Sequence, residues 1–216
     1  MNIKELNPLI PGKVLLNRFI LLEKLAPHIF VALDYESGNK VVLKQAQEAQ
    51  LQRELHCMMD CTSPYTIQPL AHFPTLLVLP YIEGRSLLTF NLEQSSLFIA
   101  IIPQLVRAIQ SVHQAGWVHG DIKPSNVLYL SKYQLITLID FGAAQPANTP
   151  LSILDEWQLT PGFTSVLKRQ GIGIIEAKDD WYALKQWLEQ IDHASLSNRD
   201  KHQFLNWTRW LHSKCN

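Results

Sequence analysis

Two polar motifs near the middle of the chain constrain its fold most strongly. The segment His119–Asn126 (HGDIKPSN) is followed, after room for one β-hairpin, by Asp140–Gly142 (DFG). A loop next to a hairpin can bring several oxygen ligands and one ammonium group to a single point. Because Mg²⁺ needs hard oxygen ligands and usually takes only one or two from protein, Asn126 and Asp140 are candidate metal ligands.

The same loop also carries Asp121 and Lys123, which suit phosphate chemistry. Phosphoryl transfer needs a carboxylate at the attacking hydroxyl and a cation at the transferring group, because catalysis rests on positioning and charge stabilisation. Asp121 fits the first role and Lys123 the second. Taken singly, Asp121 could be a turn or cap residue, but these residue types occur together and in order.

The sequence before this loop favours a small sheet with one helix. Several runs are apolar or alternating, and Ser37-Gly38-Asn39 supplies turn chemistry between two of them. Residues 45–60 favour a helix, which Ser63-Pro64 would stop. The expected strands are Phe19–Leu25, Ile29–Tyr35, Val41–Lys44, Leu70–Phe73 and Thr75–Ile82.

After residue 83 the pattern becomes mainly helical. Apolar residues recur at helical spacing over Ser95–Gly116, and two further helices are expected at Lys178–Ile191 and Asn198–Ser213. The last has a Ser-x-x-Asp start at Ser197. The sequence therefore predicts an α+β protein of two lobes. The β-rich N-lobe spans residues 1–82 and the truncated, mainly helical C-lobe spans residues 83–216.

Composition excludes several classes of protein. The 216 residues are 47% apolar, and 19 basic residues balance 19 acidic ones, so we expect a packed core and no nucleic-acid partner. The N-terminus lacks a signal-peptide pattern, and the apolar run Leu97–Ile109 is too short to cross a bilayer. We expect a cytoplasmic protein with no membrane partner. Cys57 and Cys61 lie beside His56 at metal-ligand spacing, but core positions are the more typical reading.

The motifs resemble those of the eukaryotic-type (Hanks-type) serine/threonine protein kinase family. Its H-R-D-x-K-P-x-N and D-F-G elements match His119–Asn126 and Asp140–Gly142, and its V-A-I-K strand resembles VVLK, which ends at Lys44. The resemblance implies that Lys44 holds the phosphates of ATP and that Glu54 is its ion-pair partner, with Glu48 a weaker candidate. It implies ATP and Mg²⁺ as cofactors and a protein as substrate.

Further segments extend the resemblance over roughly Phe19 to Leu188. The run Leu77–Gly84 resembles the family hinge, with Leu79 as gatekeeper and the backbone of Pro80 and Ile82 facing the adenine. Leu25 would cap the adenine. Downstream, Thr160–Phe163 resembles the segment whose threonine bonds the catalytic aspartate and lysine. His119 and Asp180 are expected to hold the catalytic loop in shape without touching substrate.

Three departures from the family stand out. No glycine occurs in Leu25–Phe30, where the family has its Gly-rich loop, so we expect a shorter or stiffer loop. Gly120 replaces the arginine that would pair with a phosphorylated loop. At the family's A-P-E position stands Ser165–Leu167. The glutamate is therefore lost, and we expect its partner among the last helices to be missing as well.

The predicted activity is ATP-dependent transfer of a phosphoryl group to a protein serine or threonine hydroxyl, including autophosphorylation. Two alternatives stay open. His-Gly-Asp followed by Asn126 also resembles small-molecule phosphotransferases of the aminoglycoside and choline kinase type, although Lys123 and Thr160 argue for protein kinases. A pseudokinase would keep the fold as a binding module. The presence of Lys44, Asp121, Asn126 and Asp140 argues against a pseudokinase, because folding alone does not require these four polar residues at these spacings.

Overall fold

The computed structural model describes residues 10–90, 95–154, 160–192 and 196–215. The chain divides into two compact units. One contains residues 1–59 and 67–83, and the other contains residues 60–66 and 84–216. The short segment 60–66 therefore belongs with the second unit although it lies among residues of the first. Each unit is described separately below.

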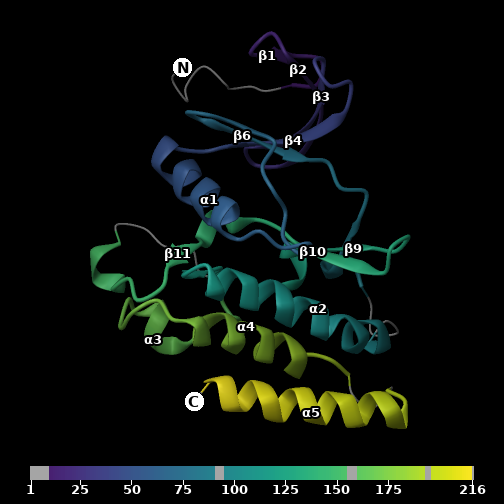
Figure 1. Cartoon of the computed structure of the whole chain (residues 1–216), viewed down its shortest axis with the longest axis vertical. Helices are drawn as coiled ribbons and strands as arrows, with labels where there is room; N and C mark the ends of the chain where they lie inside the picture. The colour runs from purple at the N-terminus through teal and green to yellow at the C-terminus, as the bar shows by residue number, and fades with distance from the viewer. Residues whose placement is uncertain (1–9, 91–94, 155–159, 193–195, 216) are drawn as a thin grey trace. The chain divides into compact units, whose positions relative to one another are not determined.

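The first unit is built on one antiparallel sheet of six strands, in the order β1-β2-β3-β4-β6-β5 (Figure 1). Alternating and β-branched segments suit such a sheet because successive side chains point to opposite faces. The expected strands are confirmed, and one short strand before them was not foreseen. The strands are β1 (Val14–Leu15), β2 (Phe19–Ala26), β3 (Ile29–Asp34), β4 (Lys40–Gln45), β5 (Ala71–Phe73) and β6 (Leu76–Pro80).

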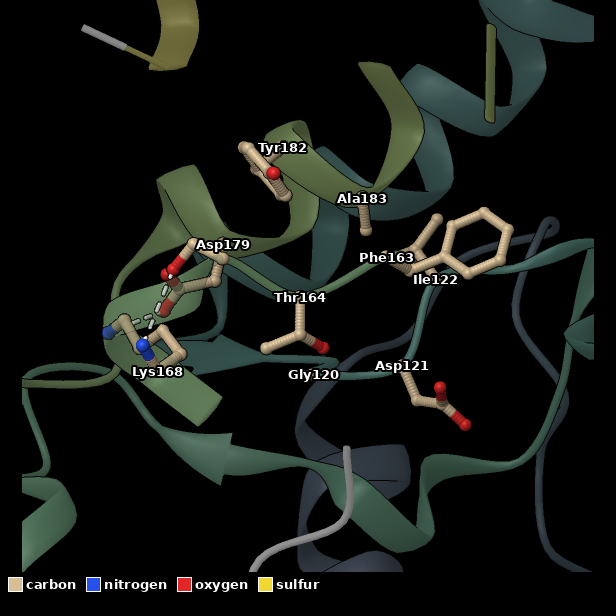
Figure 2. Close-up of a pocket in the computed structure, with 10 residues that line it drawn as sticks. Gly120, Asp121, Ile122, Phe163, Thr164, Lys168, Asp179, Tyr182 and Ala183 are labelled. Atoms are coloured by element: carbon tan, nitrogen blue, oxygen red, sulfur yellow. Dashed lines mark hydrogen bonds and ion pairs between the residues drawn. The ribbon is translucent and has the colours of Figure 1, made fainter. Parts of the chain in front are cut away.

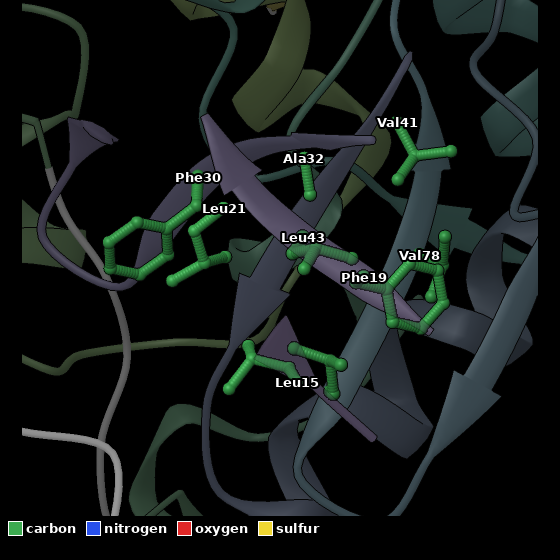
Figure 3. Close-up of a cluster of buried hydrophobic side chains, with 9 residues drawn as sticks. Leu15, Phe19, Leu21, Phe30, Ala32, Val41, Leu43 and Val78 are labelled. Atoms are coloured by element: carbon green, nitrogen blue, oxygen red, sulfur yellow. The ribbon is translucent and has the colours of Figure 1, made fainter. Parts of the chain in front are cut away.

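One face of this sheet carries a cluster of buried apolar side chains (Figure 3). In β4, Val41 and Leu43 belong to the cluster. Because side chains alternate along a strand, Val42 and Lys44 lie on the opposite face. The core thereby fixes which way Lys44 points. The cluster comprises Leu15, Phe19, Leu21, Phe30, Ala32, Val41, Leu43, Leu76 and Val78.

The β2–β3 connection stands where the family that the motifs resemble has its Gly-rich loop. Ala26 pairs with Ile29, so only Pro27 and His28 form the turn. His28 has φ of 64°, which matches a type II turn with proline at the second position and a positive φ at the third. The turn therefore has two residues, and proline makes it stiffer because the ring fixes φ.

Helix α1 (Glu48–Asp60) follows β4. Its buried side chains are Leu51, Glu54, Cys57 and Met58, at the spacing of one helical face. Cys57 and Cys61 are both buried, whereas His56 is exposed. The cysteines are therefore core residues, and His56 does not share their face.

The second unit is mainly helical, as expected. It contains α2 (Ser95–Gln114), α3 (Val166–Arg169), α4 (Ala177–Glu189) and α5 (Asn198–Cys215), of which the short α3 was not foreseen. Helix α5 packs along α4 (Figure 1). Its predicted start is confirmed, since Ser197 Oγ accepts from Asp200 N at 3.2 Å.

Helix α2 contains the apolar run Leu97–Ile109. The expectation that this segment is too short to cross a membrane was wrong, because the whole helix is long and apolar enough by length and composition alone. Ten of its 20 residues are buried, and it packs against β10 (Leu135–Leu138) and α5. Because half of its residues are buried, α2 is the core helix of this unit.

Short strands and 3₁₀ turns frame the motif-bearing loop. Strand β9 (Val127–Leu130) pairs with β10 as the predicted hairpin, and β7 (Arg85–Ser86) adds a third strand. Strand β8 (Trp117–Val118) pairs with β11 (Gln145–Pro146). The 3₁₀ turns are η2 (Leu87–Thr89), η4 (Pro124–Asn126), η5 (Phe141–Ala143) and η6 (Leu151–Ile153).

Candidate active site

Lys44 and Glu54 form an ion pair within the first unit. The Lys44 Nζ to Glu54 Oε2 distance is 2.8 Å, and the Glu54 side chain is 1% exposed. A buried carboxylate of this kind requires a charged partner, and the register of β4 and the inward face of α1 supply it. Glu48, the weaker candidate, is exposed and accepts instead from Gln52.

The predicted adenine-facing residues also lie in the first unit. Leu79 is buried in β6 and pairs with Val42 of β4, so the two share a sheet face with Lys44. Pro80 ends β6 and Ile82 follows half-buried. Leu25, near the end of β2, is 51% exposed and therefore available to a ligand.

Asp121 lies at the centre of a polar network in the second unit. Asn126 Nδ2 donates to Asp121 Oδ2 at 3.0 Å and to the Asp121 carbonyl at 2.9 Å. Lys123 Nζ lies 2.6 Å from the same Oδ2. The Asp121 side chain is only 8% exposed, so these bonds fix its rotamer. The loop that the sequence singled out thus brings together three of the predicted site residues.

Thr160 joins this network from a distant part of the chain. Its hydroxyl donates to Asp121 Oδ1 at 2.6 Å and accepts from Lys123 Nζ at 3.1 Å. The sequence comparison with protein kinases predicted these two bonds, and the geometry confirms them. Asp121 is therefore held through both of its oxygens.

Asn126 and Asp140 flank the β9–β10 hairpin. Ile139 N donates to the Asn126 carbonyl at 2.9 Å, which extends the ladder beyond Val127 and Leu138 and keeps the two residues at the same end of the hairpin. Asp140 has φ of 62°, a left-handed conformation that aspartate tolerates better than most residues. An amide oxygen and a carboxylate suit Mg²⁺, whose other ligands would be phosphate and water oxygens. This donor set fits the metal implied by the resemblance.

Asp180 of α4 anchors the loop that carries Asp121. Its carboxylate accepts from His119 N and Gly120 N, both at 2.9 Å, and His113 Nε2 lies 2.9 Å from Oδ2. Burial alone would raise the pKa of Asp180, but the bond and charge of His113, His119 and the Gly120 N–H outweigh it and the pKa is lowered. The expected structural role of Asp180 is thus borne out by its contacts.

His113 was missed by sequence reasoning. It lies near the end of α2, four residues after the buried Ile109 and so on the same helical face, and it packs edge-on against Trp181. A histidine close to the end of a core helix, shortly before the polar loop, was the available signal. His119 lies 3.2 Å from Ile139 O through Nε2 and accepts from Asp121 N through Nδ1, so it too holds the loop.

Gly120 is required by the backbone. Its φ is 78°, and a Cβ built on it would lie 2.8 Å from the Ala143 carbonyl oxygen. The sequence suggested only that a cationic side chain was missing here. The structure gives the reason: any side chain at this position meets the backbone of η5.

We expect Gly120→Ala to destabilise the second unit by about 3 kcal/mol, from the left-handed φ and the clash together. Gly38→Ala is the matched control, because Gly38 has φ of 70° and nothing within 4 Å of its built Cβ, so it should lose only about 1 kcal/mol. Urea unfolding of both variants measures the difference. Equal losses would mean that the contact with Ala143 is easily relieved.

A pocket opens beside Asp121 within the second unit (Figure 2). Phe163 and Ile122 lie on one side of it, and Lys168 and Asp179 face each other on the other side. The pocket is lined by Gly120, Asp121, Ile122, Phe163, Thr164, Ser165, Lys168, Asp179, Tyr182 and Ala183.

Comparison with known proteins agrees with this geometry. A sheet with one helix, a helical region and the loop motifs define a protein-kinase-like fold. Residues 32–187 match the family described as the protein kinase domain, and the chain belongs to that family.

Individual relatives are distant. The chain is 29% identical over 163 residues to citron Rho-interacting kinase of Homo sapiens, covering 68% of this chain and 8% of that protein. It is 27% identical over 162 residues to the serine/threonine-protein kinase cds1 of Schizosaccharomyces pombe, covering 69% and 35%. The chain therefore spans a minor part of these relatives. The structure of the Cydia pomonella granulovirus kinase PK-1 matches with a TM-score of 0.61 at 18% identity, over 88% of this chain and 75% of that one, which shows the fold alone.

Proposed function

We propose that this protein transfers the γ-phosphoryl group of ATP to a serine or threonine hydroxyl of a protein. The observation that carries the proposal is the network in which Thr160 bonds both Asp121 and Lys123. The resemblance implies that a threonine at this position is typical of protein kinases and not of small-molecule phosphotransferases. The distant serine/threonine kinase relatives support the same class of acceptor.

Asp121 is the proposed acceptor of the proton. The attacking hydroxyl oxygen forms a bond to the γ-phosphorus, the bond from that phosphorus to the bridging oxygen breaks, ADP leaves, and the hydroxyl proton passes to the Asp121 carboxylate. Lys123, 2.6 Å from Asp121, stabilises the negative charge on the group in transit. Because bonds to Thr160 and Asn126 fix the carboxylate, little reorganisation is needed at the moment of reaction.

Lys44, Asn126 and Asp140 are the proposed nucleotide and metal residues. Lys44, oriented by Glu54 at 2.8 Å, would bind phosphate oxygens of ATP. Asn126 and Asp140 would hold Mg²⁺, which neutralises negative charge on the phosphates when it is bound. Leu25, Leu79, Pro80 and Ile82 would contact the adenine.

The β2–β3 hairpin favours a second candidate, a pseudokinase that binds partners without turnover. A Pro27-His28 turn cannot approach phosphates as glycines do, and tight phosphate contact is part of kinase catalysis. Nucleotide binding without transfer to any acceptor would identify this candidate.

The test is transfer of label from γ-labelled ATP to a basic protein acceptor by the wild type, Thr160→Val and Thr160→Ser. Valine keeps the shape but removes both hydrogen bonds, so the rate should fall on the order of a hundredfold, whereas serine should keep most of the activity. Label that appears only on aminoglycoside or choline acceptors would replace the protein-kinase assignment with the small-molecule one.

A further inference from the structure

The first turn of α4 carries two adjacent carboxylates that reach different segments of the second unit. Asp180 accepts from the backbone of His119 and Gly120, and so holds the loop that carries Asp121. Asp179 lies 2.9 Å, through Oδ2, from Lys168 Nζ of α3. Two neighbouring residues of α4 therefore bind two separate segments, the loop at His119 and Gly120 and helix α3 at Lys168.

Lys168 and Asp179 are both largely buried. The Lys168 side chain is 10% exposed and that of Asp179 is 20% exposed, and the contact lies in the wall of the pocket beside Asp121 (Figure 2). The same Asp179 Oδ2 accepts from Glu176 N at 2.8 Å, which caps α4 and fixes the carboxylate. Lys168 is thus held by a rigid acceptor on a 13-residue helix.

Helix α3 is linked to Thr160 by a short segment, residues 161–165. Ser165 caps α3 by accepting from Lys168 N, and Thr164 Oγ1 donates to the Thr160 carbonyl at 3.2 Å. Holding Lys168 in place therefore restrains the five residues between Thr160 and α3. The Thr160 hydroxyl can then meet Asp121 Oδ1 at 2.6 Å.

We propose that the Lys168–Asp179 ion pair is a positioning device that holds the Thr160 segment against Asp121. The inference deepens the proposed function and rests on it. Asp179 and Asp180 together fix both partners of the Thr160–Asp121 hydrogen bond to the same helix. In this proposal Lys168 and Asp179 are positioning residues that act through Thr160.

This pair is not primarily a source of folding stability. Burial raises the pKa of Asp179, more than the Glu176 N–H and Lys168 lower it. A carboxyl whose pKa is raised by folding makes folding less favourable once it is ionised. Replacing both members of a buried pair with neutral groups of similar size often leaves stability unchanged or higher. Effects on turnover and on stability should therefore separate.

The test compares Lys168→Met, Asp179→Asn and the double variant with the wild type. Asparagine keeps an oxygen for the Glu176 N–H, and methionine keeps the length of the stem. Each single change should lower kcat about tenfold or more, with KM for ATP unchanged. Because the pair acts as a unit, the double variant should lose no more than the worse single variant. It should also recover the thermal midpoint of the wild type without recovering kcat, and Lys168→Arg should restore most of kcat.

The matched control is Lys178→Met, which breaks the more exposed Lys178–Glu176 pair at the same end of α4 and should leave kcat unchanged. Losses in kcat that follow the thermal midpoint across the variants, or that multiply in the double variant, would overturn the proposal.

Amide hydrogen exchange separates failure of this inference from failure of the proposed function. Even in a wild type without transfer activity, Lys168→Met and Asp179→Asn should raise exchange at residues 162–165 by about tenfold, and Lys178→Met should not. Unchanged exchange in the two single variants would overturn the positioning role regardless of activity.

Discussion

Replacing Asp121 with asparagine is expected to abolish phosphoryl transfer. Removal of a general base costs on the order of a thousandfold, and asparagine has the shape of the carboxylate but cannot accept the proton. Thermal stability should fall modestly, because the amide nitrogen that replaces Oδ2 cannot accept from Lys123 and Asn126. The remaining side-chain oxygen can still accept from Thr160, and the bond from Asn126 to the Asp121 carbonyl persists. Rates of label transfer and thermal unfolding measure these two effects, and ATP titrations on the same preparation should show that nucleotide binding is kept.

Asp60→Asn is the control for this experiment. Asp60 is an exposed carboxyl at the end of α1 that accepts from Trp117 Nε1, a bond that asparagine can keep, and it has no place in the candidate site. Transfer at the wild-type rate in Asp121→Asn would remove Asp121 from the reaction. Loss of ATP affinity in parallel with transfer would assign it to binding.

Replacing Asp180 with alanine is expected to cause the largest loss of stability. The change leaves the amides of His119 and Gly120 and the ring of His113 without their buried acceptor. Each unsatisfied buried donor costs about 1–3 kcal/mol, so a total near 4 kcal/mol is expected for the second unit. Transfer should fall as well, since the loop that carries Asp121 loses its anchor. Urea unfolding at neutral pH is the measurement.

The effect of Asp180 should depend on pH. Its pKa is lowered in the folded protein, through the hydrogen bond and charge of His113 despite the opposing effect of burial. An aspartate of this kind stabilises the fold above about pH 4 and stops doing so as the pH falls through its lowered value. The stability difference between wild type and Asp180→Ala should therefore shrink in strong acid. Glu189→Ala, an exposed position on α4, should change stability by no more than about 0.5 kcal/mol at any pH.

Much of the fold could be predicted from the sequence because periodicity is a local signal. The alternating strands around Val41–Lys44, the helix over residues 48–60 and the hairpin after Asn126 all appear where they were expected. The pairing of Lys44 with Glu54 and the two bonds of Thr160 followed from motif resemblance. The catalytic and binding roles of these residues stay predictions.

Other features could not be read from the sequence because they depend on contacts between distant segments. Strand β7 has two residues and exists only through its pairing with β9. At Gly120 the sequence indicated only the absence of the family arginine, because the positive φ and the nearby Ala143 carbonyl are properties of the folded backbone. At the A-P-E position the sequence indicated a missing ion pair, whereas α3 carries Lys168 against Asp179 a little further along.

The most direct test of the central claim is the chemical identity of the phosphorylated product. Purified protein is incubated with Mg²⁺, γ-labelled ATP and a basic protein acceptor, and the labelled residues are identified after hydrolysis. The account predicts phosphoserine or phosphothreonine, on the acceptor or on the chain itself, formed by the wild type and absent when Mg²⁺ is chelated. Nucleotide that binds with Mg²⁺ while no serine or threonine becomes labelled would contradict it.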